Sequence, residues 1–356
     1  MKRYLVLEDG HIFAGEGFGA DREVLAEVVF ATGMVGMTES LTDPSYAGQA
    51  LVQTFPETFT VGAITADAES DIFGPDAYIV RHWSEHPSNF RAELRLDDWL
   101  ASGGIAGLGG IDTRALTRII REHGVMNGFI TDDPARADAT AIRDYRVRDA
   151  VARVSTKTPY TVGPDRGAAA YRVALLDYGM KRNILRSLTE RGCEVTVLPH
   201  DTTGEQVLAL SPDGIFLSNG PGDPADNVQE IAVLQTLCRS GLPIMGICLG
   251  HQLLALAHGF KTEKMRFGHR GANQPVRDRE TGRVCMSTQN HGYAVARESI
   301  DEKLAGVWFE NANDNTVEGI RYKDAPIASV QFHPEACAGP RDTRFLFDSF
   351  INMMAR

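Results

Sequence analysis

The sequence has little of what marks secreted, membrane or disulfide-linked proteins. Its five cysteines include no CxxC pair and leave one over from any full pairing, which fits a reducing compartment. No apolar run approaches the length of a membrane span, and the apolar residues that follow Met1-Lys2-Arg3 are too few for a signal-peptide core. We therefore expect a cytoplasmic protein that makes no membrane contact.

Positive charge is in deficit, because 36 lysine and arginine residues face 47 aspartate and glutamate residues, for a formal net charge of −11. Binding to nucleic-acid phosphates depends on clustered Lys and Arg, so we expect no nucleic-acid partner. No His or Cys pair has the spacing of metal ligands, and we expect no metal site. Two glycine groups, at 15–19 and 103–110, lack the spacing of a phosphate-binding loop, and we interpret both as turns.

What the sequence does have is the composition of a folded protein, with 43% apolar and 23% charged residues over 356 positions. That length favours two domains. In residues 1–150, short apolar runs around turn signals such as Asp9-Gly10 predict a smaller N-terminal α+β domain. Residues 111–123 have helical spacing, with Asp112 as a candidate N-cap. Prolines, glycines and polar residues predict a linker at 151–170.

Residues 171–356 alternate strand and helix signals. Such alternation predicts an α/β domain with a mostly parallel sheet flanked by helices. Catalytic groups in these sheets lie beyond the carboxyl ends of the strands. Because Cys248, Asn219-Gly220 and His333 all follow apparent strands, we expect them at one edge of the sheet.

Cys248 is the strongest candidate for a nucleophile. It lies between Gly246 and Gly250, where an apolar run meets a predicted helix whose amino terminus stabilises a thiolate. Thiol chemistry also needs a base and a carboxylate that orients it, and only Pro334 separates His333 from Glu335, so both side chains point to one face of an extended segment. Each residue alone is equally compatible with packing or surface roles, but together they predict a catalytic triad.

Two polar segments supply candidate binding groups. Residues 218–224 fit a rigid surface turn by themselves, yet the backbone N–H of Gly220 also suits an oxyanion, with that of Leu249 as a second donor. Gln252 lies one helical turn after Cys248 and shares its face. Residues 289–293 form another polar cluster, which by itself we interpret as a loop.

The motifs at 246–252, 219–224 and 333–335 resemble those of class I, triad-type glutamine amidotransferases, which hydrolyse the side-chain amide of glutamine. Four further stretches resemble the small chains of carbamoyl phosphate synthetases. The amino-terminal ones matter most, since other amidotransferases share the later motifs without them. The four stretches are Thr42-Asp43-Pro44-Ser45-Tyr46, Gly110-Ile111-Asp112-Thr113-Arg114-Ala115-Leu116, Asp177-Tyr178-Gly179 and Phe267-Gly268-His269-Arg270-Gly271-Ala272-Asn273.

The resemblance implies a role for each residue of the site. It makes Cys248 the nucleophile, His333 the base and acid, and Glu335 the group that orients His333. It also makes the N–H groups of Gly220 and Leu249 the donors to the oxyanion. The positions that correspond to glutamine-binding residues of the family are Ser45, Gly222, Gln252, Asn290, Gly292 and Tyr293, the last standing where phenylalanine is also expected.

The resemblance further implies a partner. This is a carbamoyl phosphate synthetase large chain, in a heterodimer or a higher assembly, which receives ammonia and makes carbamoyl phosphate for arginine and pyrimidine synthesis. No cofactor is expected in this chain, and ATP and metal ions are expected on the large chain.

Two other readings of the sequence stay open. A stand-alone thiol hydrolase of the α/β-hydrolase kind is suggested by Gly246-x-Cys248-x-Gly250, although the acid of that fold precedes the histidine, whereas Glu335 follows His333. A non-catalytic regulatory or scaffold subunit with an idle triad is the second.

Overall fold

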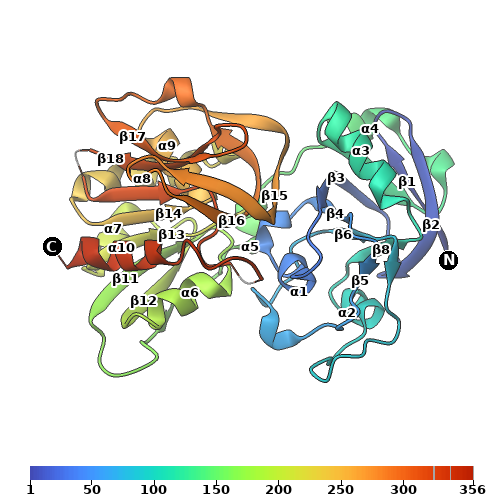
Figure 1. Ribbon diagram of the computed structural model, residues 1–356, viewed down its shortest axis with the longest axis horizontal. Helices are drawn as coiled ribbons and strands as arrows, with labels where there is room; N and C mark the ends of the chain where they lie inside the picture. Colours follow the sequence, from blue (N-terminus) through green and yellow to red (C-terminus); the bar gives the residue numbers. More distant parts are fainter. Residues whose placement is uncertain (324, 337, 356) are drawn as a thin grey trace. The chain divides into compact units, whose positions relative to one another are not determined.

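The computed structural model describes residues 1–323, 325–336 and 338–355. The chain divides into two compact units, Met1–Ala150 and Val151–Arg356, which are described separately below (Figure 1). The segment 151–170, where we expect a linker, contains most of α5 (Ala150–Val154) and all of β10 (Tyr160–Val162), and β10 pairs with a strand of the second unit.

The first unit is built on a closed barrel with the strand order β1-β2-β8-β6-β4-β3-β9, in which β9 pairs with β1. Parallel pairs join β3, β4, β6 and β8, and antiparallel pairs close the rest. The turn expected at Asp9-Gly10 is confirmed, since β1 and β2 pair around it as a hairpin and Gly10 has φ of 90°. The strands are β1 (Lys2–Leu7), β2 (Ile12–Gly19), β3 (Val24–Ala31), β4 (Gln49–Gln53), β6 (Ala77–Ile79), β8 (Ala106–Gly109) and β9 (Met126–Thr131), and a separate pair is β5 (Glu57–Thr58) with β7 (His82–Trp83).

The interpretation of both glycine groups as turns is confirmed only in part: the group at 15–19 lies within a barrel strand, whereas in the group at 103–110 Gly103, Gly104 and Gly110 lie in turns or bends outside the strand. Residues 15–19 belong to β2 and residues 106–109 to β8. Aromatic rings occupy the space that side chains would need there: a Cβ at Gly107 would lie 2.6 Å from the Phe18 ring, and one at Gly109 would lie 2.2 Å from the Trp83 ring. These two rings stack with centroids 4.2 Å apart, so the glycines make room for an aromatic layer.

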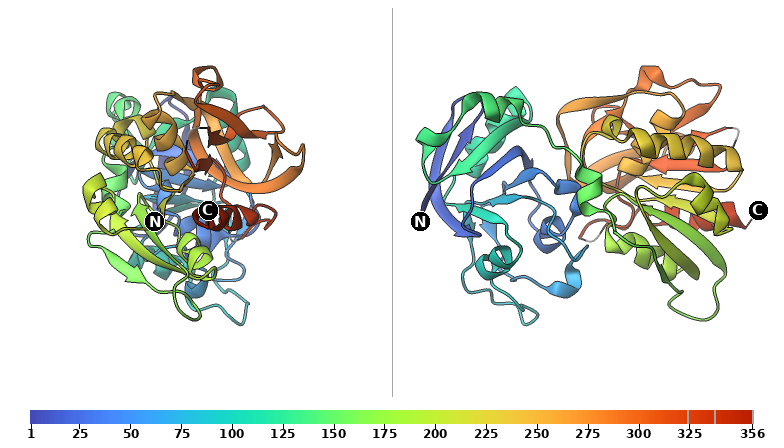
Figure 2. Two further views of the ribbon diagram at one scale, coloured as in Figure 1. Left: turned by 90° about the vertical axis from the view of Figure 1, so that its left-hand side faces the viewer. Right: turned by 180° about the vertical axis from the view of Figure 1, so that it is seen from behind.

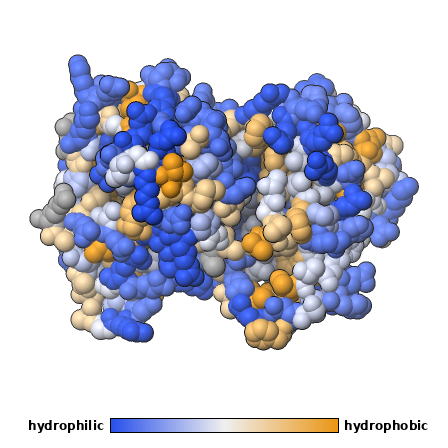
Figure 3. Space-filling view, viewed as in Figure 1, coloured by the Kyte–Doolittle hydropathy of each residue, from blue (hydrophilic) through white to orange (hydrophobic). Residues whose placement is uncertain are grey.

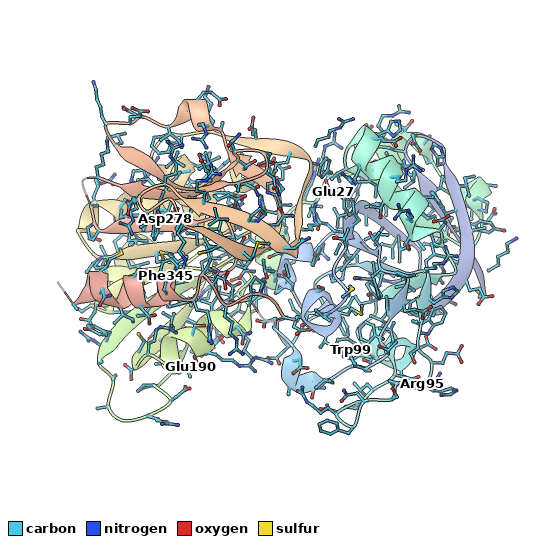
Figure 4. The ribbon with its side chains drawn as sticks, viewed as in Figure 1. Glu27, Arg95, Trp99, Glu190, Asp278 and Phe345 are labelled. Atoms are coloured by element: carbon cyan, nitrogen blue, oxygen red, sulfur yellow. The ribbon has the colours of Figure 1, made fainter. Side chains whose placement is uncertain are left out.

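The helices of the first unit follow their sequence signals. The helix predicted at 111–123 is confirmed as α3 (Thr113–His123), and the Asp112 side chain accepts a hydrogen bond from the Ala115 N–H at 3.0 Å. In α2 (Leu96–Ser102), Trp99 turns into the core, where its ring centroid lies 4.8 Å from that of Phe73 (Figure 4). The other helices of this unit are α1 (Met37–Leu41) and α4 (Ala139–Asp144).

The second unit contains a ten-stranded sheet with the order β10-β12-β11-β13-β14-β19-β18-β16-β15-β17. Its central strands β12, β11, β13, β14 and β19 are parallel neighbours. Short apolar strands buried along their length are typical of a sheet covered on both faces. The central strands are β11 (Tyr171–Asp177), β12 (Cys193–Pro199), β13 (Gly214–Leu217), β14 (Ile244–Ile247) and β19 (Ile327–Val330).

Helices pack on both faces of these parallel strands (Figures 1 and 2). On one face, side chains of α7, α8 and α9 share a core with Ala174, Leu176 and Leu217. On the other face, side chains of α6 and α10 pack with Leu175 and Phe216. The helices are α6 (Arg182–Thr189), α7 (Gly204–Ala209), α8 (Val228–Leu237), α9 (Leu249–Ala257) and α10 (Phe345–Met354).

Beyond β19 the sheet is antiparallel, so the prediction of a mostly parallel sheet is not confirmed for the sheet as a whole. The long strands β15 and β16 pair with each other, and β17 and β18 complete this part. Many side chains of β15 are partly or fully exposed, and antiparallel strands tolerate such exposure better than parallel ones. The strands are β15 (Thr262–Asp278), β16 (Val284–Val295), β17 (Ala305–Asn311) and β18 (Val317–Tyr322).

The surface agrees with the polar composition. Hydrophilic residues predominate on the face shown in Figure 3, and hydrophobic residues occur there in small groups. Within the residues that the structure describes, no helix has the length and hydrophobicity that crossing a membrane requires.

Candidate active site

Cys248 occupies a strained turn between β14 and α9. It stands at the N-cap position of α9 with φ of 53° and ψ of −103°, although it is not a glycine. Its backbone N–H donates to the Val330 carbonyl of β19 at 2.9 Å, and its carbonyl accepts from the Gln252 N–H at 3.1 Å. A non-glycine residue in this conformation costs on the order of 1–3 kcal/mol, and such strain clusters at functional sites.

The flanking glycines allow the turn to be this tight. A Cβ at Gly246 would lie 2.8 Å from the backbone of Gly250, and a Cβ at Gly250 would lie 2.7 Å from the backbone of Leu217. Contacts this short are not tolerated against backbone atoms. The Gly-x-Cys-x-Gly pattern therefore has a steric cause, as the sequence predicts.

His333 and Glu335 form a buried pair beyond the end of β19. The Glu335 Oε1 atom lies 2.7 Å from Nδ1 of His333 and 3.3 Å from Nζ of Lys181. His333 is fully buried and Glu335 is 3% exposed. The His333 N–H donates to the Thr288 carbonyl at 2.9 Å, which fixes the backbone of this segment against β16.

The electrostatics of the pair favour a protonated imidazole. Burial and the Lys181 ammonium group lower the pKa of His333, but the Glu335 carboxylate and the nearby Cys248 side chain raise it, and the pKa settles at about 9 instead of 6.5. Burial raises the pKa of Glu335, but His333 and Lys181 lower it by a larger amount. The net pKa therefore lies below its usual value, and the carboxyl group is ionised. The Cys248 side chain is among the groups that raise the His333 pKa, so it lies near the imidazole, and Nε2 of His333 has no hydrogen-bond partner among the described residues.

The loop after β13 lies beside Cys248. A Cβ at Gly220 would lie 2.7 Å from the Leu249 side chain and 2.3 Å from the Tyr178 carbonyl oxygen, so only glycine fits. The side chain of Asn219 accepts from the Lys181 N–H at 3.1 Å, which holds the loop against the segment after β11. Leu249 is the first residue of α9, and the first N–H groups of a helix have no partner within it. The Gly220 loop thus lies against Leu249, the residue after the nucleophile, and the role of the two N–H groups as oxyanion donors stays a prediction.

Residues 289–293 belong to strand β16, so the prediction that they form a loop is wrong. The Asn290 carbonyl lies 3.7 Å from Sγ of Cys248. The Tyr293 carbonyl accepts from Nε2 of Gln252 at 2.9 Å. Their polarity made them look like a loop, but on the strand the Gln289 and His291 side chains bind each other at 3.1 Å, and the contacts with Cys248 and Gln252 are made by backbone carbonyls. Gly292 lies between Asn290 and Tyr293 on the same strand, and Gly222 has φ of 90° in the β13 loop.

Comparison with known proteins agrees with this geometry. Residues 174–353 match the family described as "Glutamine amidotransferase class-I", and residues 5–130 match "Carbamoyl-phosphate synthase small chain, CPSase domain". The carbamoyl phosphate synthase small chain of Bacillus cereus (strain ATCC 10987 / NRS 248) is 48% identical over 99% of this chain and 96% of its own length. That of Streptococcus agalactiae serotype III (strain NEM316) is 47% identical, over 99% and 98%.

The chain belongs to the carbamoyl phosphate synthase small-chain family. It is therefore a glutamine amidotransferase subunit, and the resemblance seen in the sequence is confirmed. Ser45, which the family pattern assigns to glutamine binding, lies in the first unit within the short helix Pro44–Tyr46. Its N–H donates to the Asp43 side chain at 3.0 Å, and it is 8% exposed. Its part in the site stays a prediction.

Sequence reasoning missed two buried residues of this small-chain site. Lys181 contacts Glu335, and Gln331 contacts Gln252 through Oε1 at 2.9 Å. Lys181 follows β11 at the carboxyl edge of the parallel strands, so the strand-end rule that found Cys248 was available for it as well. Gln331 is separated from the His-Pro-Glu motif by Phe332 and carried no signal of its own.

One cluster in the described part of the chain has donor atoms suited to a metal ion. His269, His291 and Glu318 are buried, with one ligand atom from each within 4.8 Å of the others. Each histidine already has other partners: His269 lies 2.9 Å from Asp314, and His291 lies 2.8 Å from the Tyr293 carbonyl. The sequence did not predict this cluster, because its members come from three different strands.

Proposed function

We propose that this small chain hydrolyses the side-chain amide of L-glutamine through a thioester on Cys248 and passes the ammonia to a carbamoyl phosphate synthetase large chain. One observation carries the proposal. A cysteine held in a strained strand-to-helix turn lies beside a buried histidine, and that histidine is 2.7 Å from a carboxylate. This is the arrangement that nucleophilic catalysis by a thiol requires.

The reaction begins when the Cys248 thiolate attacks the carboxamide carbon of glutamine. The carbonyl oxygen becomes an oxyanion, which the N–H groups of Gly220 and Leu249 stabilise. Loss of one such donor slows turnover by about a hundredfold or more. His333, whose raised pKa keeps it protonated at neutral pH, then gives its proton to the departing nitrogen, and ammonia leaves.

The glutamyl thioester is next hydrolysed by water. His333 takes a proton from the water as the oxygen attacks the thioester carbon, the carbon–sulfur bond breaks, and glutamate leaves. Glu335 stabilises the imidazolium in both half-reactions through the bond to Nδ1, and Lys181 keeps that carboxylate ionised.

Free ammonia in neutral water becomes ammonium and loses its nucleophilicity, so a second active site must receive it. We assign that site to the large chain, with its ATP and metal ions, making carbamoyl phosphate for arginine and pyrimidine synthesis. A heterodimer or a higher assembly of the two chains in the cytoplasm is the simplest setting. The free thiols of Cys193, Cys238, Cys248 and Cys285 support a reducing compartment.

We further propose that the two halves divide the work. Residues 1–150 contribute partner contacts and Ser45, whereas residues 171–356 carry the amidotransferase chemistry. Glutamine is then held by Ser45, Gly222, Gln252, Asn290, Gly292 and Tyr293.

The test is Cys248→Ser in the complex with the large chain. We expect glutamine-driven synthesis of carbamoyl phosphate to vanish while synthesis from added ammonia persists. Loss of both activities, or of neither, contradicts the proposal. Labelling of Cys248 by a glutamine-like electrophile separates this function from that of a scaffold subunit with an idle triad, because an idle thiol reacts no faster than the other thiols.

A further inference from the structure

The carboxamide of Gln252 is held by two acceptors at once. Its Nε2 atom donates to the Tyr293 carbonyl and to Oε1 of Gln331, each at 2.9 Å. A carboxamide NH₂ group has two hydrogens, so both are used. Because a backbone carbonyl only accepts, the Tyr293 bond fixes which end of the Gln252 amide is nitrogen.

The remaining polar atom of this carboxamide is its carbonyl oxygen. Within the described part of the chain, Oε1 of Gln252 has no hydrogen-bond partner. Gln252 lies one helical turn after Cys248 and therefore on the same face of α9. The group that Gln252 offers to a ligand there is an acceptor. In L-glutamine the α-ammonium group is a donor, whereas the α-carboxylate only accepts.

Gln331 accepts the hydrogen bond of Gln252, but its own amide nitrogen, Nε2, is left without a partner among the described residues. The residue is fully buried. A buried donor without a partner is unfavourable, so such a group calls for an explanation. The reverse orientation would satisfy Gln331 no better, because its NH₂ would then face the NH₂ of Gln252.

The backbone around Gln331 is equally fixed. Its N–H donates to the Glu318 carbonyl of β18 at 2.9 Å, and two residues later the His333 N–H donates to Thr288. The segment that carries the general base thus also carries the residue that orients Gln252.

We propose that Gln331 is a positioning residue: it locks the Gln252 carboxamide with its oxygen toward the substrate, and so makes the site select amides that carry an α-ammonium group. The inference rests on the proposed glutamine hydrolysis. It adds a positioning residue, Gln331, and an acceptor oxygen on Gln252 that faces the substrate. The catalytic triad requires neither.

The experiment uses Gln331→Met in the complex with the large chain, with Gln235→Met on the exposed face of α8 as a matched control. Glutaramate, which is glutamine without its α-amino group, serves as a competitive inhibitor. We expect the KM for glutamine to rise by about three- to tenfold, the strength of one neutral hydrogen bond. The kcat and the inhibition constant of glutaramate should stay within about twofold of the unaltered chain, and Gln235→Met should change none of these values.

An equal weakening of glutamine and glutaramate, or a fall in kcat alone, would overturn the proposal. Should Gln331→Met fail to fold, Gln331→Glu keeps an acceptor oxygen for Gln252, and we expect it to retain the preference for glutamine over glutaramate; loss of that preference overturns the proposal too. Cys248→Ser is assayed in parallel. If it still hydrolyses glutamine, the proposed function itself fails, whatever Gln331 does.

Discussion

Gly220→Ala gives the sharpest test of the oxyanion site. The added methyl group would lie 2.3 Å from the carbonyl oxygen of Tyr178 and 2.7 Å from the Leu249 side chain. Ordinary van der Waals contact begins at 3.4 Å, so the loop backbone must move by about 1 Å. The first of these contacts is with backbone, which cannot turn aside as a flexible side chain can.

The expected loss follows from that displacement. A shift of about 1 Å in a positioned group costs about a hundredfold in rate, and removal of an oxyanion donor costs about 10²–10³ in kcat. We therefore expect kcat for glutamine hydrolysis to fall by about a hundredfold, with a smaller change in KM. The free energy of unfolding should fall by about 1–3 kcal/mol because the substitution overpacks the loop.

The assay measures glutamate release by the complex with the large chain, and synthesis from added ammonia reports on the partner site. Gly163→Ala is the control, because a Cβ at Gly163 would meet no heavy atom within 4 Å. A folded Gly220→Ala variant with undiminished kcat would refute the placement of the oxyanion beside Gly220.

Three further predictions concern stability. The free energy of unfolding of Cys248→Gly, measured with denaturant, should exceed that of Cys248→Ala by about 1 kcal/mol, because glycine relieves the strain at φ of 53°. The opposite order would show that the turn is not strained. Burial lowers the pKa of His251 to about 3, so the unfolded chain binds the extra proton below pH 6.5 and the free energy of unfolding falls as pH drops toward 3, by up to about 1.4 kcal/mol per pH unit. His251→Gln should lose less stability than the unaltered chain between pH 7 and pH 5, and equal losses would contradict this assignment. Asp112→Ala should destabilise the first unit by about 1 kcal/mol in thermal or denaturant unfolding through loss of the cap on α3, and an unchanged midpoint would show that the cap contributes nothing.

The sequence predicted those features whose cause lies within a few residues of the chain. Asp112 caps α3 because a side-chain oxygen three residues before an N–H needs no tertiary help. The turn at Cys248 was readable because the close approach of Gly246 to Gly250 lies within a few residues, although Gly250 also lies against Leu217 of the neighbouring strand. The spacing of His333 and Glu335 likewise fixes their common face in any extended segment.

The errors came from features that depend on distant neighbours. Gly107 and Gly109 of β8 look like turn residues until the Phe18 and Trp83 rings are known to fill the space beside them, and Gly15 and Gly19 of β2 until the neighbouring backbone is known. Residues 289–293 look like a loop because their side chains are polar, but on β16 those of Gln289 and His291 bind each other. The antiparallel half of the sheet was missed because alternation of strand and helix signals was extended past α9, where helices no longer separate the strands.

The register of two strands has a consequence for how this chemistry can be controlled. Ile247 of β14 pairs with Val330 of β19, and the Cys248 N–H bonds to the Val330 carbonyl. The backbone of Cys248 is therefore held to the end of β19, and three residues later the His333 N–H bonds to the Thr288 carbonyl of β16, so pulling the two residues apart means breaking backbone hydrogen bonds. Small motions of the loops leave that spacing intact. A partner that switches glutamine hydrolysis on or off therefore has to act on the entry of the substrate amide or on the position of the backbone N–H groups that would bind the oxyanion.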